Sequence, residues 1–164
     1  MKDRVMELLQ SADTTPLERY AVAQPQAVRS LIGRLWDPDA AIRQRAAAAI
    51  GAAAAEHSEL GREVVRRLVW ALNDEAATNG VYGLVAIGEI GARSPVLIAP
   101  FVGPVACYAW DEGLRMEIIR AMIRIAGAAP DLVAPFIDDI KQRVDPDDAS
   151  EVALMADLAL KVGL

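Results

Sequence analysis

The sequence predicts an all-α protein, an α-solenoid in which about four pairs of helices stack along one axis. Hydrophobic residues make up 54% of the 164 residues but aromatic ones only 5%, so small and aliphatic side chains supply the core, which suits packed helices better than a sandwich of strands. No segment alternates apolar and polar residues with a strand's period of two. An acidic turn also recurs, at intervals of 37, 37 and 34 residues: Asp37, Asp74, Asp111 and Asp145.

The length of the chain suits one domain over residues 1–164, with irregular capping helices in residues 1–25 and the repeats in residues 26–164. Proline fits the first position of a helix, because the N–H that it lacks would have no partner there. Helix starts are therefore expected at four sites: Thr15-Pro16, Gln24-Pro25, Ser94-Pro95 and Ala129-Pro130.

Within each repeat, the acidic turn is expected to start the second helix. Asp37 and Asp145 each precede a proline, so each is expected to cap the free N–H groups of the helix behind it. Apolar residues in the first repeat then follow at spacings of three and four, which predicts one buried stripe: Ile42, Ala46, Ala49, Ile50 and Ala53. Each second helix is expected to end near a glycine: Gly51, Gly88 or Gly91, Gly127 and Gly163.

The last helix is expected over residues 147–162. Its spacing turns one set of apolar residues toward the preceding repeat, namely Val152, Met155, Leu158 and Val162. The same spacing turns Glu151, Asp157 and Lys161 toward water. Leu154 and Leu160 then have no core position, so they either cover a neighbouring helix or mediate self-association. A homodimer formed through an end or a face is therefore one expectation.

The first repeat, LWDPDAAIRQRAAAAIG at residues 35–51, resembles a HEAT repeat of the short bacterial type named after phycobilin lyases. That pattern runs from an acidic turn through a Val/Ile-Arg pair and paired alanines to a Leu/Ile-Gly ending. The later repeats keep parts of it: Asn73-Asp74 and Ala86-Ile87-Gly88 in the second, where Gly80 replaces the arginine, and Trp110-Asp111 and Arg120-Ala121 in the third. The fourth repeat keeps little beyond its turn.

The resemblance implies a fold more than an activity. It favours a non-catalytic module that binds another protein or serves as a scaffold, with no cofactor and no catalytic or metal-binding residues. The alternative, by analogy with the lyases, is a tetrapyrrole lyase or a chaperone for bilin or haem.

Candidate partner-binding residues come from two features, the tryptophans near the turns and the unusual segment 73–83. Trp36 and Trp110 both precede a turn aspartate, so they are expected at equivalent positions where they either anchor a partner or pack beneath their own turns. The segment and Glu89 either form a polar pocket for a cation, peptide or small ligand, or form a capped turn whose glycine lets two helices touch. The full set is Trp36, Trp70, Asn73, Asp74, Glu75, Gly80, Tyr82, Glu89 and Trp110.

Charge and composition limit the other partners. A formal charge of −6 argues against nucleic acid as a partner. No run approaches the roughly 18 apolar residues of a membrane span, so a cytoplasmic location is expected. One cysteine and one histidine exclude a disulfide framework and a Cys/His zinc site. His57 is expected at the surface and Cys107 in the core. The basic cluster Arg62, Arg66 and Arg67 is expected to be a solvated face with acidic partners at Glu59 and Glu63.

Overall fold

The computed structural model describes residues 1–73 and 80–164, and within these ranges the chain forms helices joined by turns, with no strand. The predicted all-α class is therefore confirmed for this part of the chain. The α-helices are α1 (Lys2–Leu9), α2 (Thr15–Ala23), α3 (Val28–Arg34), α4 (Ala40–Glu56), α5 (Ser58–Ala71), α6 (Gly80–Arg93), α7 (Pro95–Ile98), α8 (Val102–Cys107), α9 (Glu112–Ala128), α10 (Pro130–Val133), α11 (Ile137–Lys141) and α12 (Ala149–Lys161). Short 3₁₀ segments join some of them: η1 (Pro25–Ala27), η2 (Ala99–Phe101), η3 (Tyr108–Trp110) and η4 (Ala134–Phe136).

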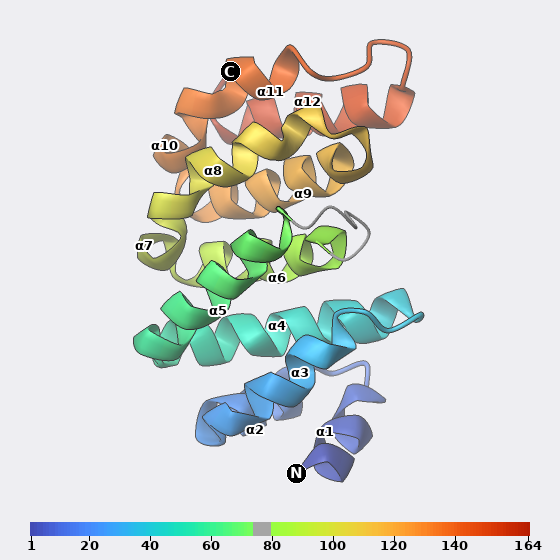
Figure 1. Cartoon of the computed structure of the whole chain (residues 1–164), viewed down its shortest axis with the longest axis vertical. Coiled ribbons are helices and arrows are strands. Elements are labelled where there is room, and N and C mark those ends of the chain that lie inside the picture. Colours follow the sequence, from blue (N-terminus) through green and yellow to red (C-terminus); the bar gives the residue numbers. More distant parts are fainter. Residues whose placement is uncertain (74–79) are drawn as a thin grey trace.

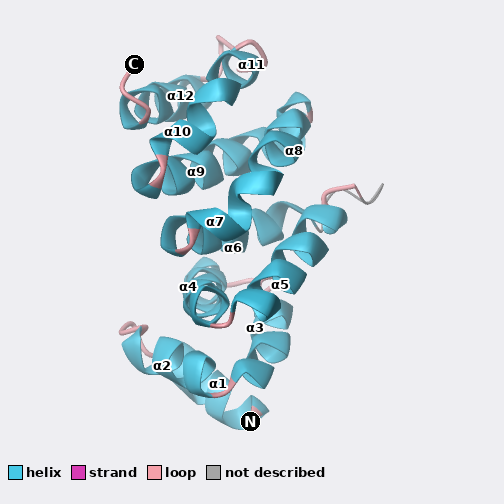
Figure 2. Ribbon diagram, turned by 90° about the vertical axis from the view of Figure 1, so that its left-hand side faces the viewer, coloured by secondary structure: helices cyan, strands magenta, loops and turns pink. Residues whose placement is uncertain are grey.

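The helices lie in two layers along the long axis of the molecule, and the two termini lie at opposite ends of that axis (Figure 1). In the first layer, α2, α4, α6, α9 and α12 follow one another, and each packs against the next (Figure 2). The second layer contains α3, α5, α7 with α8, and α10 with α11, while α1 lies beside α2 and α3. Among the described helices, none combines the length and the apolar content that crossing a bilayer requires.

The predicted helix starts and the predicted buried stripe are both confirmed. Proline occupies one of the first two positions of α2, η1, α7 and α10. In α4 every residue of the predicted stripe is buried: Ile42, Ala46, Ala49, Ile50 and Ala53. The run of alanines removes bulk at this position, which lets α4 pack between α2 and α6.

The aspartates that cap the first-layer helices are only partly those predicted. Asp111 caps α9 as expected, and its carboxylate accepts a backbone N–H at 2.9 Å. The prediction was wrong for Asp37 and Asp145, because α4 and α12 are capped by Asp39 and Asp148 instead. Asp37 and Asp145 each accept the backbone N–H two residues further along the chain. Each therefore shapes the turn before the helix, and the proline that follows belongs to that turn.

The glycines predicted near helix ends lie there only in part. Gly91 and Gly127 lie in the last turns of α6 and α9, as predicted. Gly51 and Gly88 do not end their helices but lie inside α4 and α6. A Cβ added to Gly51 would lie 3.1 Å from the backbone of Glu89, and a Cβ added to Gly88 would lie 3.2 Å from the Cα of Ala121. Each glycine therefore lets one first-layer helix approach the next closely. Gly163 does follow the end of α12 as predicted, and it has a positive φ of 83°.

Candidate functional site

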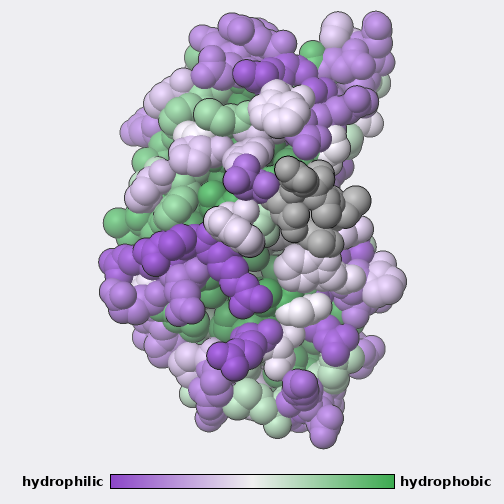
Figure 3. All heavy atoms as spheres, viewed as in Figure 1, coloured by the Kyte–Doolittle hydropathy of each residue, from purple (hydrophilic) through white to green (hydrophobic). Residues whose placement is uncertain are grey.

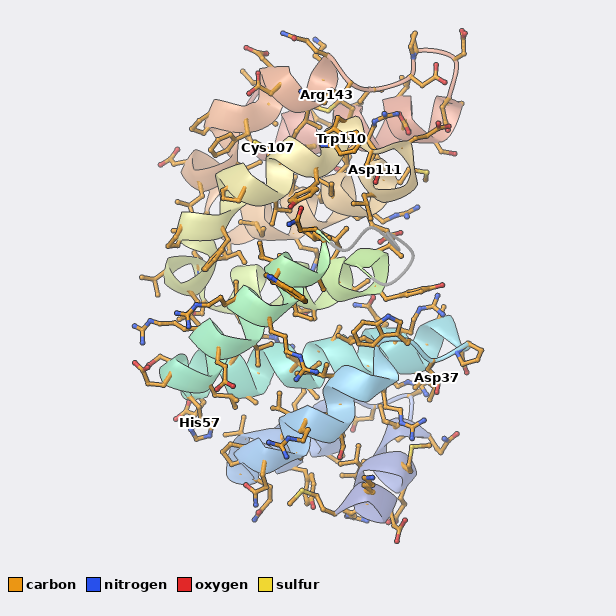
Figure 4. All side chains as sticks on the ribbon, viewed as in Figure 1. Asp37, His57, Cys107, Trp110, Asp111 and Arg143 are labelled. Atoms are coloured by element: carbon orange, nitrogen blue, oxygen red, sulfur yellow. The ribbon has the colours of Figure 1, made fainter. Side chains whose placement is uncertain are left out.

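The turn edge is the side of the molecule where second-layer helices end and first-layer helices begin, on the right of Figure 1. Trp36 follows the end of α3, Trp70 lies in the last turn of α5, and Trp110 ends η3. Their exposed fractions are 36%, 74% and 61%, so neither Trp70 nor Trp110 packs beneath its own turn. Figure 4 shows Trp110 next to Asp111, with Asp37 further along the same side.

Trp36 and Trp110 do not occupy equivalent positions, which corrects the prediction. Trp36 precedes the capping residue of its helix, Asp39, by three positions, whereas Trp110 precedes its capping residue, Asp111, by one. The difference follows from the later cap of α4. Both side chains still lie at the turn edge, because each belongs to the turn that precedes a first-layer helix.

The segment 73–83 is described only in part. Asn73 is exposed, whereas Asp74 and Glu75 lie outside the described residues. At Gly80 an added Cβ would lie 2.9 Å from the carbonyl oxygen of Ala71, so the start of α6 touches the end of α5 through this glycine. This contact supports the structural alternative for Gly80, in which the glycine lets two helices touch.

Tyr82 contacts an arginine of the neighbouring helix. The guanidinium carbon of Arg43 on α4 lies 5.1 Å from the centre of the Tyr82 ring on α6, within the range of a cation–π contact. The same guanidinium donates hydrogen bonds to the carbonyl oxygens of Asp37 at 2.7 Å and Pro38 at 3.1 Å. Arg43 therefore joins the turn before its own helix to α6, the next helix of the first layer.

Arg115 makes a matching set of contacts in α9. Its guanidinium donates to the carbonyl oxygens of Ala109 at 2.8 Å and Trp110 at 3.3 Å, and to both carboxylate oxygens of Glu151 on α12 at 3.2 Å. Glu151 also accepts the backbone N–H of Asp145 at 2.8 Å. The ion pair between Arg115 and Glu151 is buried, and it joins α9 to α12, the last two helices of the first layer.

The sequence signal for this device is the distance from the helix cap. Arg43 and Arg115 each lie four residues after the capping aspartate, and each donates to the carbonyls one and two residues before it. Arg115, and not Arg120, therefore makes in α9 the contacts that Arg43 makes in α4. Glu151 was predicted to face water, which is wrong, because its carboxylate turns inward to meet Arg115. Val152, predicted to face the core, is instead exposed.

Glu89 lies apart from the tryptophans. It is buried in α6, where its carboxylate accepts hydrogen bonds from Arg124 of α9 at 2.9 and 3.1 Å and from Gln44 of α4 at 3.3 Å. Arg93 adds an ion pair at 3.8 Å. Glu89 stands nine positions after Gly80, about 13 Å along the helix axis. The two residues therefore do not line one pocket, and Glu89 links three first-layer helices.

The single cysteine and the single histidine differ from expectation. Cys107 is exposed, so its assignment to the core was wrong; it ends α8, where the chain leaves the helix on the outer side. His57 is only half-buried, and its Nε2 lies 2.7 Å from the carbonyl oxygen of Val22. His57 therefore ties the start of α5 to α2 and is not a free surface residue.

The basic cluster is exposed as predicted, and of its two predicted acidic partners the structure shows Glu59. Figure 3 shows hydrophilic side chains gathered over α5, and Arg62 forms an exposed ion pair with Glu59 on that helix. Within residues 1–73 and 80–164, no three His, Cys, Asp or Glu side chains gather in a way that would hold a metal ion.

No protein-family model matches this chain, and a search of curated proteins finds no significant match. The resemblance to HEAT repeats therefore stays a prediction. The contacts at the turn edge and between the layers are the basis for a functional proposal.

Proposed function

We propose that this chain is a non-catalytic scaffold that binds another protein along its turn edge, on an α-solenoid of HEAT-like helical pairs. Two observations support the repeat part of the proposal. First-layer helices pack in chain order, and the contacts of Arg43 in α4 recur at Arg115 in α9 with the same spacing from the cap. A repeated local device of this kind is typical of a chain built from one structural unit.

The exposure of the tryptophans at the turn edge carries the functional part. Trp70 and Trp110 are 74% and 61% exposed. Burying the side chain of a tryptophan removes about 150–250 Å² from water, which is favourable, so a partner that covers these side chains would be stabilised by them. Tryptophan is also among the residues most enriched where proteins bind one another tightly. Helices that pack side by side lie about 8–10 Å apart, so the ends of successive second-layer helices present aromatic side chains at intervals that one partner surface can cover.

Four charged residues in the described part of the same edge have structural partners, which favours binding over catalysis. Asp39 and Asp111 cap helices, and Arg43 and Arg115 are held by backbone carbonyls. Each of these four side chains is therefore held by a hydrogen bond within the fold. The exposed side chains of Trp70 and Trp110, by contrast, remain available to a partner.

Replacing both Trp70 and Trp110 with alanine is expected to weaken the capture of the partner by about 30-fold or more, the loss typical of one strong interface residue. The tagged wild-type chain and the W70A/W110A variant are compared as baits in lysate of the source organism, with captured proteins quantified by mass spectrometry. The fold should stay intact, because truncating exposed side chains changes the free energy of unfolding by roughly 0.5 kcal/mol or less.

Val96→Ala is the matched control, since Val96 is 78% exposed but begins α7, away from the turn edge. A protein captured equally by wild type and V96A, and lost from W70A/W110A, supports the proposal. Equal capture by all three baits, or no protein enriched by wild type, contradicts it.

A further inference from the structure

A groove with an apolar floor lies at the C-terminal end of the stack, between α11 and α12. Its volume is about 510 Å³, and its apolar lining includes Ile137, Val144, Val152, Met155, Ala159 and Leu164. Leu164 is 73% exposed, and so is Leu160 on the same helix. One acidic and one basic residue, Asp138 and Lys141, also line this groove. The groove is thus apolar in its centre, with one carboxylate and one ammonium group in its lining.

A second groove lies near the opposite end, between α1 and α3. Its volume is about 430 Å³, and Val5 and Met6 supply its apolar lining. Three basic residues border it: Lys2, Arg29 and Arg34. Gly33 also lines this groove, and a Cβ added there would meet no atom within 4 Å.

The two ends carry opposite charge. Residues 130–164 contain eight acidic and three basic side chains, whereas residues 1–34 contain four acidic and five basic ones. The grooves lie at opposite ends of the long axis, since α1 and α12 do (Figure 1). Two C-terminal ends brought together would repel each other, while a C-terminal end and an N-terminal end attract.

We propose that a second copy of this chain covers the C-terminal groove, with α1 of one copy seated between α11 and α12 of the next. Lys2 and the neighbouring arginines then face Asp138 and the acidic end around it. In this arrangement α1 and α2 of the second copy pack after α11 and α12 of the first. The stack of helices therefore continues from one copy into the next. Such a contact joins two different surfaces, so a growing assembly always has one free N-terminal groove and one free C-terminal groove. Short linear assemblies should therefore lengthen as the protein concentration rises.

Two blocking variants test the joint at positions that tolerate a longer side chain. Gly33→Glu places a carboxylate in the basic groove, where there is open space. Ala156→Arg places a guanidinium in the C-terminal groove from an exposed position of α12. The controls carry the same changes outside both grooves: Gly127→Glu, also in open space, and Ala153→Arg, at another exposed position of α12.

Sedimentation velocity is run on each protein over a roughly 100-fold range of concentration. Wild type and both controls are expected to form larger species as concentration rises, and added salt should weaken them. Each blocked variant alone should associate at least about 10-fold more weakly. An equal mixture of G33E and A156R should form a dimer and nothing larger, because each copy retains one working end.

Each remaining outcome overturns the proposal. If wild type is monomeric throughout, no joint forms. If A156R is monomeric but G33E associates like wild type, then the C-terminal ends pair with each other. If the mixture of blocked variants stays monomeric while circular dichroism shows both to be folded, the two grooves do not meet. The tryptophans of the turn edge take no part in this joint, so the result is independent of the proposed scaffold function.

Discussion

Replacing Arg115 with methionine is expected to lower the free energy of unfolding by about 3–5 kcal/mol. Methionine keeps much of the length of the side chain but leaves the buried carboxylate of Glu151 without its cation. The substitution also removes the donors to the carbonyls of Ala109 and Trp110, so the turn before α9 loses its support. Urea unfolding of both proteins, followed by circular dichroism, measures the difference.

Two further variants make this result specific. The double variant Arg115→Met/Glu151→Leu should be more stable than R115M alone, because it leaves no unpaired charge in the interior. Arg120→Met removes an exposed ion pair with Glu117 on the same helix and should change stability by about 1 kcal/mol or less. If R115M loses no more stability than R120M, the buried pair does not hold α9 and α12 together.

The second large effect is expected at Gly88, where valine should destabilise the fold by about 1–3 kcal/mol or more. Its Cβ would lie 3.2 Å from the Cα of Ala121 and 3.4 Å from the Cβ of Arg124, and the two methyl groups need further room between α6 and α9. The backbone of α9 must move to provide this room, which disturbs the close packing of α6 against α9.

Gly127→Val is the matched control, because a Cβ at Gly127 on α9 meets no atom within 4 Å. Valine has a better helix propensity than glycine, so G127V should keep or slightly raise the free energy of unfolding. Thermal and urea unfolding of the two variants then give changes of opposite sign. Equal changes would show that helix propensity, not the contact between α6 and α9, decides the effect at Gly88.

The features that the sequence predicted correctly depend on residues close together in the chain. Proline at Pro16, Pro95 and Pro130 marks helix starts through its own geometry, and the stripe of α4 follows from helical spacing alone. Both signals act within one or two turns of helix. They therefore predict the helical class and the positions of the turns without any knowledge of which helices pack against one another.

The features that the sequence did not predict depend on contacts between helices that are distant in the chain. Glu151 occupies a position that would face water on an isolated helix. In the fold its carboxylate turns inward, because it accepts hydrogen bonds from Arg115 on the neighbouring helix α9. Gly51 looks like a helix end until α6 is placed against it. At the candidate site, the exposure of Trp70 and Trp110 depends on which helices cover the turn edge. That information lies about one repeat away in the chain.

The order of the first-layer helices has a consequence for how the chain folds. Because α4 meets α2 before it and α6 after it, and α9 meets α6 and α12, most packing joins segments that are near one another in the chain. Folding rates rise as contacts become more local, since short loops lose less entropy on closing. Each helix that leaves the ribosome finds its support in the helices synthesised just before it. Assembly can then proceed from the N-terminal end without waiting for the last helix.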